Sequence, residues 1–217
     1  MKNRKNRYRR NVTVIAATLL IILLFKFASD KEKLEVNRVK YINSSAKVID
    51  FFDFNDLETS AELIVSGTKV SVEKQYIERD GMGDVIGYGT KSAIKINKVI
   101  KSRNKEITIG KYITVLESGA TEQTNKGTLV YGMEGYQLMN EKEEYLLFLD
   151  KSLTDPNLYF IKGVYYGKIP LKQPSKGKLQ SNGDASPYDF QYKGEVTEKL
   201  EQIFTDALIK YKNEYEM

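Results

Sequence analysis

Two arrangements of side chains near residue 60 have the residue types that hydrolysis uses. Paired carboxylates serve as acid and base in glycoside hydrolases, and acidic residues are dense at Asp50, Asp53, Asp56, Glu58 and Glu62. Ser66 and Lys69 follow, and a lysine beside a serine can activate it as a nucleophile. Acidic residues also stabilise the first turn of a helix, and Ser66 and Lys69 have opposite parity in a regular strand. We therefore favour structural roles, with a Ser-Lys or paired-carboxylate hydrolase as the alternative.

The chain contains no histidine and no cysteine. A Ser-His-Asp triad, a Cys-His dyad, a disulfide framework and a Cys/His zinc site are therefore excluded. We expect no catalytic residue, no cofactor and no metal site.

The stretch RDGMGDVIGYGTK, residues 79–91, places four glycines in nine positions. A phosphate-binding glycine loop runs from a strand into a helix, whose N-terminus supplies amide donors. Here strand-like sequences lie on both sides, and the Gly-Lys-Ser/Thr ending of a P-loop is missing. We predict a long β-hairpin in which glycines adopt positive φ angles, and Asp80 and Asp84 as turn residues rather than calcium ligands.

Tyrosine is the common aromatic residue, with 15 copies against nine phenylalanines and no tryptophan. A tyrosine suits a half-wet binding face, because its ring packs while its hydroxyl reaches a ligand. The same residues also suit an ordinary sheet surface. The ligand-binding candidates are Tyr131, Tyr136, Tyr159, Tyr165 and Tyr166.

The N-terminus has the parts of an export signal: a basic run, an apolar run and a polar exit. The only small pair near its end is Ala28-Ser29, a poor cleavage site because Lys26 and Phe27 precede it. We therefore predict an uncleaved transmembrane signal-anchor over 12–28. The positive-inside rule places residues 1–11 in the cytoplasm and the body outside.

The net charge of +5 comes from this N-terminus. Seven of the 34 basic residues and none of the 29 acidic ones lie in the first 28 positions, which leaves the rest slightly acidic. We expect no nucleic-acid partner, because phosphate binding needs a dense positive face.

The body has the residue period of strands. A change of parity at Gly67 predicts a β-bulge, and Ile107, Ile109, Ile113 and Val115 are expected to share one buried face. The predicted strands lie in 63–74, 92–100, 106–118, 143–150 and 158–171.

A C-terminal amphipathic helix is predicted by apolar residues at helical spacing, with Thr197 as N-cap. They are Val196, Leu200, Ile203, Phe204, Ala207, Leu208 and Tyr211. We expect this stripe to pack on the sheet.

These patterns predict a mainly β protein: a small antiparallel, OB-like barrel of about five strands, preceded by one transmembrane helix. The expected boundaries are a cytoplasmic segment 1–11, an anchor 12–28, a stalk 29–47, a barrel 48–171, an exposed linker 172–194 and a helix 195–217.

The motifs TSAELIVSGTKVSVEK, SAIKINKVIK, EITIGKYITVLESG and EKEEYLLFL resemble a loose group of secreted or membrane-anchored proteins of Gram-positive, Bacillus-like bacteria. The group is of unknown function, and the pattern is also distantly similar to the netrin-like (NTR) barrels, which are OB-like. The resemblance covers residues 54–170 and implies a fold and an envelope location without a reaction. Inhibitors of the NTR type use an N-terminal cysteine, which this chain lacks.

We therefore expect a membrane-anchored binding module outside the cytoplasm, whose partner is an envelope protein, a peptide or a wall polymer. An envelope hydrolase is the alternative.

The absence of cysteine allows a direct test of this topology. With Ser181→Cys in the predicted linker, a membrane-impermeant maleimide should label intact cells, and the cysteine-free parent should stay unlabelled. Labelling only after lysis would place the body in the cytoplasm and contradict the prediction.

Overall fold

The computed structural model describes Lys26, residues 39–171 and residues 198–215. This part of the chain is mainly β with a C-terminal helix, as predicted. In chain order its elements are β1 (Val39–Ser44), α2 (Phe54–Ser60), β2 (Leu63–Arg79), β3 (Val85–Ser102), β4 (Tyr112–Glu117), β5 (Gly119–Thr124), β6 (Gly127–Met133), β7 (Glu144–Lys151), β8 (Leu158–Ile161), β9 (Lys168–Pro170) and α3 (Glu198–Tyr215).

The chain divides into two compact units, residues 1–40 with 121–129 and residues 41–120 with 130–217. In the first unit, the described residues include the turn between β5 and β6. The Thr124 hydroxyl donates to the carbonyl of Gly127 at 2.8 Å, and Thr128 donates to the Gln123 side chain at 2.9 Å. Gly127 has a φ of 125°, which favours glycine at this turn.

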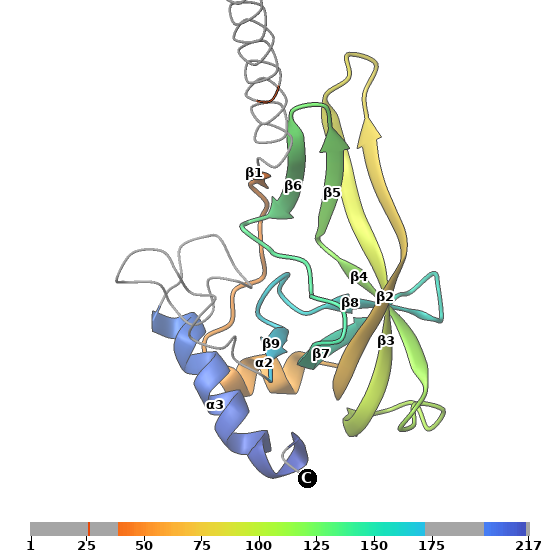
Figure 1. Cartoon of the computed structure of the whole chain (residues 1–217). Coiled ribbons are helices and arrows are strands. Elements are labelled where there is room, and N and C mark those ends of the chain that lie inside the picture. Colours follow the sequence, from red (N-terminus) through yellow and green to blue (C-terminus); the bar gives the residue numbers. More distant parts are fainter. Residues whose placement is uncertain (1–25, 27–38, 172–197, 216–217) are drawn as a thin grey trace, which may run out of the picture. The chain divides into compact units, whose positions relative to one another are not determined.

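Five strands of the second unit each pair with two others of the same set (Figure 1). β2 pairs antiparallel with β3 and also, over Leu63–Thr68, with β7. β3 pairs with β4, β4 pairs in parallel with β8, and β8 pairs with β7. β9 pairs antiparallel with β7 over Tyr145–Leu147, on the edge opposite β2. A separate sheet has the order β1-β6-β5.

The glycine-rich stretch forms the predicted hairpin between β2 and β3. Its turn is tightened by Asp80, whose carboxylate accepts the backbone N–H groups of Met82 and Asp84, each at 2.9 Å. The prediction of positive φ angles holds for Gly83, with a φ of 90°, and was wrong for Gly81, Gly87 and Gly89. Gly89 has a different role in β3. A Cβ there would lie 2.7 Å from the Tyr76 hydroxyl, so glycine makes room for the ring of its cross-strand partner.

A register shift is present between Ser66 and Gly67, at the predicted place, but the unpaired residue there is Asn97 of β3, and the nearest unpaired residue of β2 is Val70, between Lys69 and Ser71. A Cβ on Gly67 would lie 2.6 Å from Cγ2 of Ile94, so no other residue fits without displacing β3. Ser66 and Lys69 keep their opposite parity, because β2 runs in unbroken register against β7 over Leu63–Thr68, and both are buried because this part of β2 is covered on both faces.

Several strand predictions were wrong in detail. Ile109 is exposed, since residues 105–111 form a turn in which Gly110 has a φ of 83° and β4 begins only at Tyr112. The last predicted strand, 158–171, is two strands, β8 and β9, separated by a turn at Gly163 with a φ of 58°. β5 and β6 were not predicted, and β1 lies inside the predicted stalk 29–47. The described chain therefore has nine strands where about five were expected.

β7 is buried on both faces, as its unbroken apolar run predicts. Tyr145, Leu147 and Leu149 belong to one hydrophobic cluster, among the strands. Leu146 and Phe148 belong to the other, which contains the apolar residues of α2 and α3. This strand therefore separates the two cores.

α3 packs through the predicted stripe, beside α2 (Figure 1). The buried members are Leu200, Ile203, Phe204, Ala207 and Tyr211, and Leu208 is partly buried against them. The Tyr211 ring meets Phe54 of α2 at 6.1 Å and 81°. Val196 and Thr197 lie outside the described residues.

In the described part of the chain, neither helix has the length and apolar character that a membrane span needs. The predicted anchor 12–28, apart from Lys26, and the predicted linker 172–194 lie outside the described residues.

A pair of identical substitutions on α3 tests this packing. Ile203 is 1 % exposed and Ile209 is 70 % exposed. Ile203→Ala should lower the free energy of unfolding by about 2–5 kcal/mol, because it leaves a cavity in the core. Ile209→Ala should change it by no more than about 0.5 kcal/mol. Urea unfolding of the full chain measures both, and equal effects would show that α3 does not pack through this face.

Candidate functional site

The acidic residues around α2 have structural roles. The Asp53 carboxylate caps the helix by accepting the N–H of Asp56 at 2.9 Å. Asp56 in turn accepts the N–H of Phe52 at 3.1 Å, and Glu62 accepts the N–H of Lys151 at 3.1 Å. These contacts tie loops and strand ends to the helix.

Asp50 and Glu58 bind α3. Asp50 lies 2.5 Å from Lys199 Nζ and also accepts the hydroxyl of Tyr166. The hydrogen bonds from Lys199 and Tyr166 lower the pKa of Asp50. Burial acts to raise the pKa of Glu58, but the hydrogen bonds from Lys210, at 2.6 Å, and from Tyr211 outweigh it and lower the pKa. Both carboxylates are therefore held as anions by helix partners, which is not the arrangement of a glycosidase pair.

Lys69 belongs to a buried polar cluster that the sequence did not reveal. Its ammonium lies 2.7 Å from Oε1 of Glu117 and donates to the carbonyl of Met139 at 2.8 Å, rather than to Ser66. Ser92, on the neighbouring strand, donates to the same Glu117 oxygen at 2.5 Å. Lys69 is 2 % exposed and Glu117 is fully buried, so no substrate reaches them.

The second carboxylate oxygen of Glu117 is also occupied. Oε2 accepts the hydroxyl of Tyr136 at 2.9 Å and the backbone N–H of Met139 at 2.6 Å. Glu117 therefore accepts four hydrogen bonds, and its charge is balanced by Lys69. Burial, followed by the negative charge of Glu117, raises the pKa of Tyr136 well above its usual range, so this hydroxyl remains a donor.

Lys168 of β9 adds a second buried amine. It donates to the carbonyl of Gln137, and its Nζ lies 4.1 Å from the centroid of the Tyr136 ring. Burial lowers the pKa of Lys168 to about 7, although Glu117 acts in the opposite direction. The cluster is therefore part of the structural core, and the Lys168 amine changes its protonation state near neutral pH.

The predicted tyrosines do not form one binding face. Tyr165 stacks on Tyr166 with centroids 4.9 Å apart, and Tyr131 lies 5.4 Å from Tyr88. Tyr136 is in the buried cluster, and Tyr166 donates to Asp50 at 2.7 Å. All of the five except Tyr165 are buried. Of the five, Tyr159 lines the pocket described next.

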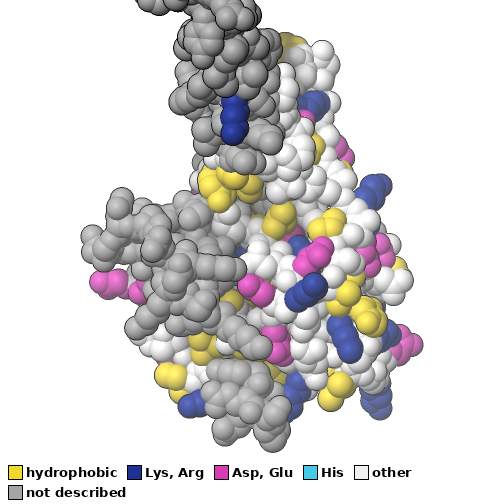
Figure 2. Space-filling view, viewed as in Figure 1, with side chains coloured by type: hydrophobic (Ala, Val, Ile, Leu, Met, Phe, Trp, Pro, Cys, Tyr) yellow, Lys and Arg dark blue, Asp and Glu magenta, His cyan; other side chains and the backbone are white. Residues whose placement is uncertain are grey.

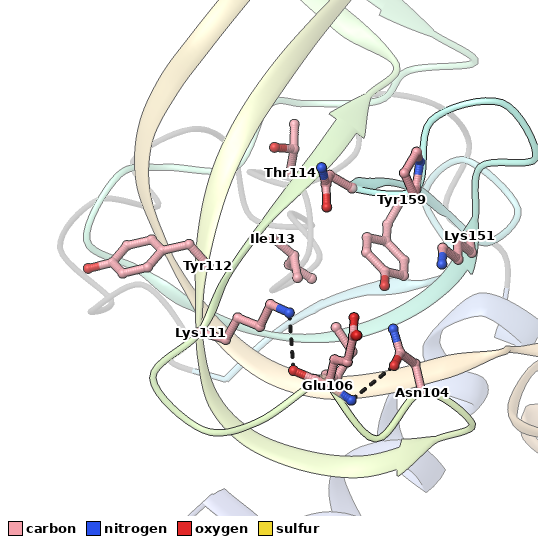
Figure 3. Close-up of a pocket in the computed structure, with 11 residues that line it drawn as sticks. Asn104, Glu106, Lys111, Tyr112, Ile113, Thr114, Lys151 and Tyr159 are labelled. Atoms are coloured by element: carbon pink, nitrogen blue, oxygen red, sulfur yellow. Dashed lines mark hydrogen bonds between the residues drawn. The ribbon is translucent and has the colours of Figure 1, made fainter.

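That pocket is a hollow of about 340 Å³ where β4 and β8 begin (Figure 3). Its floor is formed by Ile107, Ile113 and Tyr159, each less than 9 % exposed. The other residues around it are Asn104, Glu106, Lys111, Tyr112, Thr114, Lys151, Pro156 and Asn157. A smaller hollow of about 120 Å³ shares part of this lining and extends it to Glu62 and Arg103.

The turn before β4 is fixed by its own hydrogen bonds. The side-chain carbonyl of Asn104 accepts the N–H of Glu106 at 2.9 Å, and Lys111 Nζ donates to the carbonyl of Glu106 at 3.1 Å. Backbone bonds join Ile96 to Gly110 and to Lys111, at 2.8 and 2.9 Å. A turn held in this way presents its side chains in a defined arrangement before a ligand arrives.

Tyr159 provides a donor beside the pocket. Burial, and then the charges of Glu62 and Glu106, raise its pKa against an opposing hydrogen bond with Asn104. The hydroxyl therefore stays protonated at neutral pH. Most of the lining residues lie in turns that carry no sequence motif. Tyr159 is therefore the one lining residue that was predicted from the sequence as a ligand-binding candidate.

The chain matches no model of a known protein family and no curated protein. The case for a function therefore rests on the pocket and the cluster.

Lys168 predicts a specific dependence of stability on pH. Its pKa is about 7 in the folded chain and near 10.5 when exposed, so between these values the unfolded chain binds more protons. The free energy of unfolding should therefore rise as the pH increases from 7 towards 10. Lys168→Met should remove that part of the rise, because methionine has no amine to titrate.

Urea unfolding at pH 7 and pH 9 measures the effect, with Lys105→Met as an exposed control that should keep the parent's slope. A Lys168→Met chain with the parent's slope would contradict the prediction.

Proposed function

We propose that this protein is a single-pass membrane-anchored binding module whose body lies outside the cytoplasm. The observation that carries the binding function is the pocket in front of Tyr159, a concave site with an apolar floor and polar walls, which is typical of ligand sites. Its volume of about 340 Å³ is in the range of small-ligand sites.

The pairing of the strands supports an OB-like barrel as the frame of this site. β2, β3, β4, β8 and β7 pair in a closed order, since β2 also pairs with β7. In chain order β4 and β8 are the third and fifth of these strands, and they pair in parallel, which suits a five-stranded Greek-key barrel of the OB type. The pocket would then lie at one mouth of the barrel, a common place for ligand binding.

We favour binding over hydrolysis because the side chains that could act in hydrolysis already form hydrogen bonds and ion pairs within the chain. Lys69 and Ser92 are buried on Glu117, and Asp50 and Glu58 are held by α3. A hydrolase needs its nucleophile or its acid and base in an accessible cleft. We therefore propose no enzymatic activity.

The basic N-terminal run and the apolar segment that follows it support the anchor and its orientation. On the face drawn in Figure 2, basic and acidic side chains are interspersed, which suits an envelope protein, a peptide or a wall polymer better than a nucleic acid.

The test uses the full chain immobilised in detergent. Muramidase-digested peptidoglycan and a tryptic digest of envelope proteins are passed over it, and mass spectrometry identifies what is retained. We expect fragments of unchanged mass to be retained. Asn157→Trp should abolish retention by filling the pocket, because Asn157 lines it.

Leu153→Trp is the matched control, since Leu153 is fully exposed on the same β7–β8 loop and does not line the pocket. New, shorter products would support the hydrolase instead. If the Asn157→Trp chain still retains the fragments, the pocket is not the binding site.

A further inference from the structure

Basic side chains outnumber acidic ones around the pocket. Lys111 and Lys151 line the larger hollow, and Arg103 lines the smaller one. The carboxylates are Glu106 and Glu62, and Glu62 already accepts the backbone N–H of Lys151. The excess of positive charge favours an anionic group on the ligand.

The two lysines reach the pocket from different elements. Lys111 precedes β4 and is held through Glu106, but its ammonium has three donors and uses one of them in that bond. Lys151 is the last residue of β7, and its ammonium forms no ion pair with any other described residue. Both therefore have donor capacity left for a carboxylate.

Neutral polar groups complete the wall (Figure 3). The Tyr159 hydroxyl is a donor, and Asn104 and Asn157 carry amide side chains that can both donate and accept. The Glu106 carboxylate can accept an N–H. The wall therefore offers both donors and acceptors, and a peptide backbone carries both as well.

The aromatic residues argue against a sugar, which usually lays its C–H face on an exposed ring. Tyr112 borders the pocket, but its ring is directed away from the other lining side chains (Figure 3), and Tyr159 is only 4 % exposed, so its ring is not open to stacking.

We propose that the pocket binds a short peptide through a carboxylate group, with Lys111 and Lys151 pairing with the carboxylate and Glu106 accepting a backbone N–H. This specificity rests on the binding function proposed above and names its ligand class.

The test titrates the full chain in detergent with acetyl-Ala-Ala-Ala and with its C-terminal amide, followed by saturation-transfer NMR. The free acid should bind at least about tenfold more tightly than the amide, because a charge-assisted bond is lost in the amide. Lys151→Gln should weaken binding of the acid by about tenfold. Lys105→Gln is the matched control, because Lys105 is exposed on the same turn as Lys111 and does not line the pocket.

Lys111→Gln, measured separately, gives a second reading if Lys151→Gln does not fold. Equal binding of acid and amide, or parental affinity in both lysine variants, would overturn the proposal. Binding of glucuronic acid in place of the peptide would also overturn it and assign an acidic sugar. If the peptide fails while envelope fragments are still retained in a pocket-dependent way, only the ligand class is wrong. If neither is retained, the binding function fails as well.

Discussion

The packing of the second unit depends on one buried carboxylate. Glu117 ends β4 and accepts hydrogen bonds from Lys69 of β2, from Ser92 of β3, and from Tyr136 and Met139 before β7. A charge in the interior is costly unless every oxygen is satisfied and an opposite charge is near. Both conditions hold here only when these segments are in register. The cluster therefore disfavours alternative registers, which would leave a charge unpaired.

Glycine at position 67 lets β2 and β3 approach closely beside this cluster. A side chain there would overlap Cγ2 of Ile94 on β3. The register of β2 with β3 shifts between Ser66 and Gly67, while β2 runs in unbroken register against β7 over Leu63–Thr68. Lys69 therefore lies on the face of β2 that carries Val65, among the strands, where its ammonium reaches Glu117.

The sequence predicted the elements whose signal is local. The apolar run of β7, the glycine hairpin and the stripe of α3 were predicted because burial on two faces, turn chemistry and helical spacing are each visible in a short window. The split of 158–171 into β8 and β9 was missed because it depends on a backbone turn at Gly163 within a continuous apolar pattern. β1 was missed because it is ordered by pairing with β6, far away in the chain, and β5 and β6 were missed because their residues are mixed in polarity and show no strand period.

The candidate site was harder to predict for the same reason. Glu117 looks like a surface residue at a strand end, and only the tertiary fold shows four donors converging on it. The tyrosines were chosen for their amphipathic character, but burial directs most of their hydroxyls to partners within the chain, such as Glu117 and Asp50.

The polar groups of the Glu117 cluster are buried, whereas those around the pocket are in contact with solvent. In the interior, Glu117 pairs with Lys69 and accepts hydrogen bonds from three further groups, all of them buried. At the start of β4 and β8 the floor of Ile107, Ile113 and Tyr159 ends the apolar core, and the turns above it keep their polar side chains in contact with water. A rigid interior with a pre-formed polar rim is what a binding module needs, since little ordering remains to oppose association.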